Sequence, residues 1–95
     1  MSAVIDGAIE VLNTKLDGGF DGTAKFVIAD EGSIVIDGSG AHAGDEDTDV
    51  TLSADADTFG SILSGELNAT AAFMSGKLTV DGDMGTAMKL AAVLA

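Results

Sequence analysis

The chain has 95 residues, among them 16 Asp and Glu, four Lys, no Arg and no Cys, and its formal net charge at pH 7 is −12. This length predicts one domain spanning residues 1–95. The missing cysteines exclude disulfides, thiol nucleophiles and cysteine zinc sites. Four cations cannot neutralise a nucleic-acid backbone, and an anionic membrane surface would repel the chain.

An amphipathic helix is predicted at the start of the chain. Apolar residues recur there at spacings of three and four, which places them on one helix face: Ile5, Ala8, Ile9, Leu12 and Leu16. Ser2 is expected to cap the helix, and the DGG sequence at 17–19 to end it.

A β-hairpin is predicted next, over residues 23–40. Ala24, Phe26 and Ile28 alternate with more polar or smaller neighbours, and the same holds around Ile34 and Ile36. The DEG sequence at 30–32 supplies the turn. We expect residues 41–49 to form an acidic loop, with a third strand around 50–53.

The second half alternates short helices with one more strand. A helix over 55–65 is capped by Asp55 or Asp57, and a second over 68–76 by Asn68. A fourth strand over 77–82 leads to a closing helix over 83–95, which Asp83 caps. Strands early and helices late predict an α+β fold, with a mainly antiparallel sheet and helices packed on one face.

The polar motifs give only weak support for a catalytic or metal-binding site. Asp45, Asp47 and Asp49 have the spacing of a calcium loop, but Val50 and Ala56 stand where that loop needs Gly and Glu. His42, expected in a loop, has no nucleophile motif beside it. The SGK sequence at 75–77 lacks the other residues of a phosphate loop. We therefore expect no enzyme activity, no metal site and no cofactor.

The apolar residues leave two interpretations open. Phe73, Met74, Met84 and Met88 lie close together in the sequence, and methionine adapts to irregular apolar shapes. Such residues either fill a core or surround a lipid.

Residues 49–90 resemble the sterol carrier protein type 2 family of non-specific lipid-transfer proteins. The family pattern joins a D-x-T strand, a helix with a central Phe and a final Gly, an AFMSGKL segment and a closing G-x-(hydrophobic)-x-x-A-x-K-L segment. The matching residues are Asp49, Thr51, Leu52, Asp55 or Asp57, Phe59, Leu63, Gly65, 72–78, Gly82, Met84, Ala87, Lys89 and Leu90. The chain departs from the pattern at Asn68–Ala69, where many members have Asn-Pro.

The resemblance implies five strands and an apolar tunnel between sheet and helices, taking a sterol, a fatty acid, an acyl-CoA or a similar lipid. The fifth strand would lie in 38–44 or in 17–23. The expected lining is Phe26, Ile34, Phe59, Leu63, Phe73, Met74, Leu78, Met84 and Met88. The closing helix is a candidate gate.

The remaining expectations concern partners and location. We expect a lipid or fatty-acyl ligand, no nucleic acid, no stable membrane insertion, and a monomer or weak dimer. Since no secretory signal, apolar run of 18 residues or peroxisomal address is present, a cytoplasmic location is expected. The alternative function is a structural or regulatory domain with a filled core that binds a protein partner.

Overall fold

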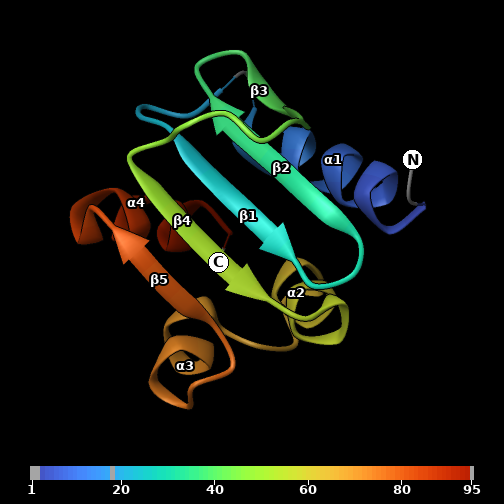
Figure 1. Ribbon diagram of the computed structural model, residues 1–95, viewed down its shortest axis with the longest axis vertical. Helices are drawn as coiled ribbons and strands as arrows, with labels where there is room; N and C mark the ends of the chain where they lie inside the picture. The colour runs from blue at the N-terminus through green and yellow to red at the C-terminus, as the bar shows by residue number, and fades with distance from the viewer. Residues whose placement is uncertain (1–2, 18, 95) are drawn as a thin grey trace.

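The computed structural model describes residues 3–17 and 19–94 (Figure 1). The elements follow the order α1 (Ala3–Leu16), β1 (Ala24–Ile28), β2 (Gly32–Asp37), β3 (Gly40–Ala43), β4 (Val50–Ala54), α2 (Ala56–Ser64), α3 (Ala69–Met74), β5 (Thr79–Gly82) and α4 (Met84–Leu94). The expected Ser2 cap and the central residue of the 17–19 helix stop lie outside the described residues.

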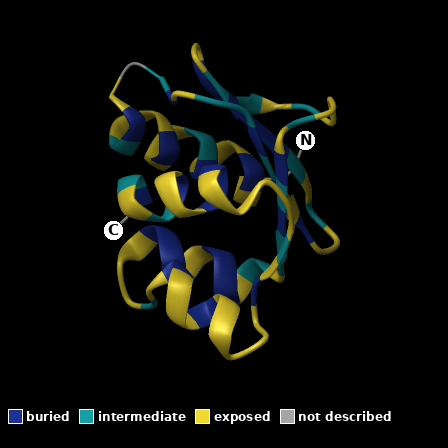
Figure 2. Ribbon diagram, turned by 90° about the vertical axis from the view of Figure 1, so that its left-hand side faces the viewer, coloured by how far each residue is buried: buried dark blue, intermediate teal, exposed yellow. Residues whose placement is uncertain are grey.

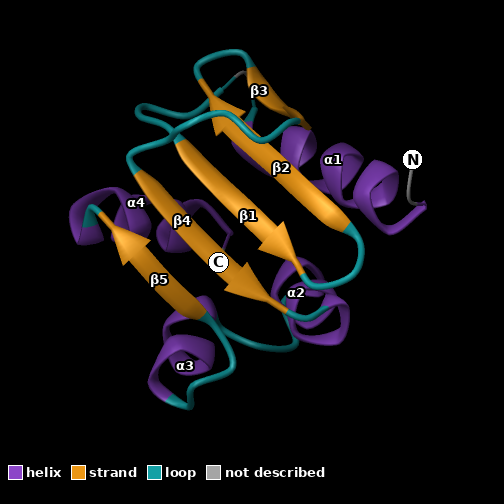
Figure 3. Cartoon of the chain, in the orientation of Figure 1, coloured by secondary structure: helices purple, strands orange, loops and turns teal. Residues whose placement is uncertain are grey.

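The sheet has five strands in the spatial order β3-β2-β1-β4-β5 (Figure 3). Three neighbouring pairs are antiparallel, but β1 and β4 run parallel, with Phe26 beside Leu52. The sheet is therefore mixed, and the expectation of a mainly antiparallel sheet was wrong.

The parallel pair arises from the segment that the sequence assigned to an acidic loop. Residues 40–43 of that region form β3, which pairs with β2, so the first of the two places considered for the fifth strand holds it. Residues 44–49 then lead back across the sheet to β4 (Figure 1). By the register, β3 ends level with Phe26 and β4 begins level with Ala24, three strands away. Six extended residues span about 20 Å, enough to cross three strand spacings of about 4.8 Å each and to return by two residues. The chain therefore enters β4 at the end where β1 begins.

A side-chain clamp explains why β3 is a strand. The Asn13 side-chain amide of α1 donates to the Ala41 carbonyl at 3.2 Å and accepts from the Ala41 N–H at 2.8 Å. A side chain on Gly40 would collide with the Asn13 amide oxygen, so the close approach of helix and strand requires glycine there.

All four helices cover one face of the sheet, and the buried residues lie between these layers (Figure 2). Phe26 of β1 and Phe59 of α2 meet across this interface, with ring centroids 4.8 Å apart and planes tilted by 50°. Both rings are fully buried, and each side chain of this kind contributes about 1.5–3 kcal/mol through burial. Leu12 of α1 completes this closely packed half of the core.

The helix caps in the second half match the sequence prediction. Asp55 caps α2 by accepting from the Thr58 N–H at 2.7 Å, and Gly65 ends α2 with a φ of +85°. Asn68 caps α3. Asp83 accepts from the Gly85 N–H at 2.9 Å at the start of α4. These caps fix where each short helix begins, and so where its apolar face points.

Candidate functional site

An apolar cavity of about 250 Å³ lies where α3 and α4 cover the β1, β4 and β5 strands. Its wall consists of Phe26, Leu52, Ala69, Thr70, Phe73, Met74, Leu78, Val80, Met84, Ala87, Met88, Leu90, Ala91 and Leu94. Thr70 is the one polar residue among these fourteen, and none of them is titratable. The wall can exclude water and contact hydrocarbon, but it offers no acid, base or nucleophile.

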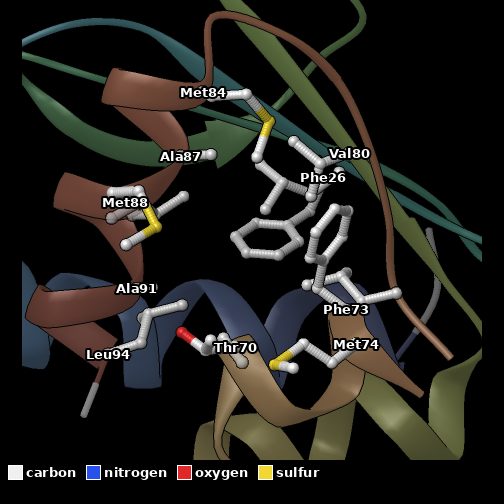
Figure 4. Close-up of a pocket in the computed structure, with 14 residues that line it drawn as sticks. Phe26, Thr70, Phe73, Met74, Val80, Met84, Ala87, Met88, Ala91 and Leu94 are labelled. Atoms are coloured by element: carbon white, nitrogen blue, oxygen red, sulfur yellow. The ribbon is translucent and has the colours of Figure 1, made fainter. Parts of the chain in front are cut away.

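Four large side chains surround the opening of this cavity. Phe73 and Met74 reach it from α3, and Met84 and Met88 approach it from α4 on the other side (Figure 4). They are 42%, 80%, 45% and 59% exposed, respectively. We call these four residues the mouth. Because they are partly exposed, the cavity opens to solvent between α3 and α4.

The floor of the cavity is buried. Leu52 of β4 pairs with Val80 of β5, and Leu52 and Leu78 are nearly inaccessible to solvent. Leu90, which is fully buried, closes the cavity from α4. Phe26 connects this floor to the closely packed half of the core through its contact with Phe59. The cavity is thus bounded by rigid strands below and by two short helices above.

Hydrogen bonds at their first turns hold both covering helices in place. The Asn68 side-chain oxygen accepts from the N–H groups of Thr70 and Ala71 at 2.8 and 3.3 Å. The Asp83 carboxylate accepts from the Thr86 hydroxyl at 3.0 Å as well as from Gly85. These hydrogen bonds hold the pKa of Asp83 below its usual value; the bond from the Thr86 hydroxyl contributes most, and the bond from the Gly85 N–H contributes next. The ionised form of Asp83 therefore anchors α4 over the cavity.

A second, smaller cavity of about 180 Å³ adjoins the first. It is lined by Ile62, Gly65, Leu67, Asn68, Ala69, Ala91 and Leu94. Ala69, Ala91 and Leu94 also line the first cavity, so these three residues form the boundary between the two.

The structure brings six of the nine predicted lining residues to the first cavity: Phe26, Phe73, Met74, Leu78, Met84 and Met88. Phe59 and Leu63 instead line a shallow groove of about 390 Å³ between α1 and α2. Ile34 is fully buried and lines none of the three spaces. Phe59 and Ile34 are both fully buried in the hydrophobic core, and neither side chain lines the first cavity.

The predicted lining did not include eight residues that line the cavity: Leu52, Ala69, Thr70, Val80, Ala87, Leu90, Ala91 and Leu94. Ala87, Ala91 and Leu94 share a helical stripe with Met84 and Met88, and that spacing was a usable signal. Leu52 and Val80 needed the β4–β5 register, which the sequence did not give.

The polar candidates lie apart from the cavity. His42 is on β3 rather than in a loop, and its Nε2 is 3.3 Å from a carboxylate oxygen of Glu46. Across residues 3–17 and 19–94, no group of three His, Cys, Asp or Glu is arranged to hold a metal ion. Within the same residues no helix is long and apolar enough to cross a membrane.

Curated relatives are much longer than this chain. It is 51% identical over 47 residues to Hydroxysteroid dehydrogenase-like protein 2 of Danio rerio, covering 50% of this chain and 11% of that protein. To the Xenopus laevis protein of the same name it is 38% identical over 81 residues, 77% of this chain and 19% of that protein.

Solved structures share the fold. The sterol carrier protein 2 of Aedes aegypti, solved in complex with palmitate, superposes with a TM-score of 0.79 at 22% identity, covering 100% of this chain and 97% of that one. The sequence profile of the SCP-2 sterol transfer family matches residues 6–95. The chain therefore belongs to the SCP-2 sterol transfer family.

Proposed function

We propose that this chain binds the hydrocarbon tail of a lipid, with a fatty acid or other single-chain lipid as the preferred class, and carries or presents it. The observation that carries this proposal is the open cavity of about 250 Å³ with thirteen apolar residues among its fourteen. Membership of the SCP-2 family and the palmitate bound to the related Aedes aegypti protein support it.

The two adjoining cavities would form one tunnel, which is apolar except where Thr70 lines the first cavity and Asn68 lines the second. Their shared boundary consists of Ala69, Ala91 and Leu94, and two of these three side chains are single methyl groups. A small movement of Leu94 would join the cavities into a long, narrow space. Such a shape suits a flexible chain better than a rigid ring system. The first cavity, at about 250 Å³, is smaller than the usual range of roughly 300–1,000 Å³, and a small space favours the same ligand class.

The energetics of the wall fit a tail rather than a headgroup. Each methylene that moves from water into the cavity contributes about 0.8 kcal/mol. An ionised carboxylate would lose its hydration there without a charged partner, so we expect it to stay at the opening. Methionine side chains adapt to ligand shape, and one methylene changes affinity by only about 1–3 kcal/mol, so selectivity among chain lengths should be low.

We further propose that the chain itself performs no catalysis. Binding into a wall without titratable groups makes and breaks no bond. The dehydrogenase-like relatives carry other sequence over most of their length, since the matches cover 11% and 19% of them. Charge repulsion between copies, each with a net charge of −12, favours a monomer or weak dimer. The cytoplasmic location stays a sequence prediction.

A cavity-filling substitution tests the proposal. Ala91 lines both cavities, so Ala91→Phe should block them and abolish displacement of a fluorescent fatty acid. Ala71→Phe is the matched control, because Ala71 is exposed on α3 and lines neither cavity. Native mass spectrometry of the freshly purified protein, followed by organic extraction, would identify a retained lipid.

The result that would overturn the proposal is equally specific. A bare mass together with no uptake of a fluorescent fatty acid by the wild type would favour the alternative, a structural or regulatory domain that binds a protein. Displacement by cholesterol but not by palmitate would shift the ligand class from single chains to sterols.

A further inference from the structure

The exposed apolar side chains are concentrated at the mouth. Seven large apolar side chains among residues 3–17 and 19–94 are exposed, and four of them are the mouth residues Phe73, Met74, Met84 and Met88. The other three are single valines on α1 and β1. Isolated exposed valines are ordinary on protein surfaces, whereas a cluster of aromatic and thioether side chains marks a contact surface.

The net charge is distributed very unevenly along the chain. Residues 1–66 contain 14 of the 16 acidic residues and two of the four lysines, which leaves −12. Residues 67–95, which include α3, β5 and α4, contain Asp81, Asp83, Lys77 and Lys89, and so have no net charge. The part of the chain that supplies the mouth is therefore neutral in a protein that is otherwise strongly acidic.

Two carboxylates beside α4 already have partners. The Asp83 carboxylate caps α4 through Gly85 and Thr86. Asp21, from the loop before β1, lies 3.4 Å from the Lys89 ammonium. The Asp83 contacts keep that carboxylate ionised and fixed at the start of α4. The Lys89–Asp21 pair brings opposite charges together beside α4, although it is solvent-exposed and its interaction is weak.

We propose that the mouth docks on the electrically neutral surface of a lipid bilayer, with the acidic part of the molecule turned away from it. This inference rests on the proposed lipid-binding function and adds the surface through which the ligand enters. Phe73, Met74, Met84 and Met88 enter the interfacial region of the bilayer, and the cavity opening lies between them. A tail can then pass from bilayer to cavity along an apolar path without crossing water.

The charge distribution favours a neutral bilayer over an anionic one. A basic protein is held on anionic lipids by its lysines and arginines, and salt weakens that attraction. Here the summed charge is repelled by an anionic surface, so the apolar mouth acts alone. Binding should therefore decrease as anionic lipid is added, and salt should increase rather than decrease binding to anionic vesicles.

Vesicle flotation of the complete chain tests the docking surface. Phosphatidylcholine vesicles should carry the wild type upward, and replacing about 30% of the lipid by phosphatidylserine should reduce that fraction in low salt. Met74→Ser/Met88→Ser should lower the partition coefficient at least about tenfold, which corresponds to about 1.4 kcal/mol. Met74→Leu/Met88→Leu should retain docking, because it keeps the apolar surface.

The matched control is Val11→Ser/Val27→Ser, which removes exposed apolar side chains that do not line the cavity and should change partition less than about twofold. Fatty-acid displacement in solution is measured for wild type in parallel. If the wild type binds the fatty acid but stays in the lower fraction of the flotation gradient, the proposed docking surface is wrong and the proposed function is unaffected. The proposed docking surface would also be wrong if the valine control lost as much vesicle binding as the methionine-to-serine variant, or if the wild type bound anionic vesicles more tightly than neutral ones. Failure to bind the fatty acid would instead overturn the proposed function.

Discussion

Leu90→Ala removes a side chain that belongs to both the core and the cavity wall. Leu90 is fully buried on α4, and its side chain borders the existing cavity of about 250 Å³. The change deletes three carbon groups at about 0.8 kcal/mol each, and the enlarged cavity adds a further penalty. We expect the free energy of unfolding to fall by about 3 kcal/mol, or about 12–24 °C in Tm for a domain of this size.

The same variant should be rescued by ligand. A fatty acid that binds only the folded state, present at about 100 times its Kd, raises the free energy of unfolding by about 2.7 kcal/mol. Urea unfolding followed by circular dichroism, with and without the fatty acid, measures both effects. If the lipid tail occupies the space that the Leu90 side chain leaves, the fatty acid should raise the free energy of unfolding of the variant at least as much as that of the wild type.

Met88→Ala provides the control on the same helix. Met88 also contacts the cavity, but it is 59% exposed, so its truncation should cost less than about 1 kcal/mol. A loss below about 1 kcal/mol for Leu90→Ala would refute the reasoning, because it would mean that α4 is not packed over β4 and β5 as described. A large loss without any ligand rescue would keep the packing and contradict the binding site.

Three further outcomes follow from the fold. In urea unfolding, Gly82→Ala should lower the free energy of unfolding by about 1–3 kcal/mol, because φ at Gly82 is +119° and a Cβ would collide with the Asp49 carbonyl. Gly7→Ala should raise the free energy of unfolding by about 0.5–1 kcal/mol, because Gly7 lies within α1 with open space around it. The pKa of Asp83 is lowered in the folded state, so the ionised carboxylate stabilises the fold at any pH above the usual aspartate pKa. This stabilisation is lost as the pH falls through the lowered pKa. In thermal unfolding below about pH 4, Asp83→Asn should therefore lose less stability than the wild type. Raising NaCl from about 0.01 to 0.5 M should raise Tm, because shorter Debye lengths screen the net charge of −12; an unchanged or lower Tm would contradict this.

The sequence predicted the elements well where the signal was local. Alternation gave β1 and β2, helical spacing gave α1 and α2, and side-chain oxygens marked the caps at Asp55, Asn68 and Asp83. Each of these features depends on residues within a few positions of one another. A single sequence is sufficient for such features, since backbone geometry alone determines which neighbours face the same way.

Features set by distant residues were not predicted. The short strand β3 is held by Asn13, which lies 28 positions earlier in the chain, and its own residues give little strand signal. Without β3, the return path of residues 44–49 and the parallel β1–β4 pair could not be foreseen. Val35 is an example: it alternates with core residues along β2, yet it is itself buried, and a Cβ at Gly44 would lie 3.4 Å from its side chain.

The same limit explains why three of the nine predicted lining residues do not lie at the first cavity. Hydrophobicity identifies residues that avoid water, but it does not say whether protein or ligand covers them. Ile34 and Phe59 are covered by protein, whereas Phe26 is covered by Phe59 on one side and borders the cavity on the other. Which residues face empty space depends on the position of α3 and α4, and that position depends on two caps and on the β4–β5 register.

The packed core and the cavity proposed to bind a lipid lie mainly in different parts of the fold. Leu12, Ile36 and Phe59 are fully buried in the half formed by α1, α2, β1 and β2, and none of them lines the first cavity. The half under α3 and α4 has alanines at its inner positions and flexible methionines at its edge. Because a cavity costs stability in proportion to its volume, a domain of 95 residues can keep one open only if its remaining core is closely packed. This division predicts that substitutions in the first half affect stability in parallel with binding, whereas Ala91 and the mouth residues can be changed to alter binding alone.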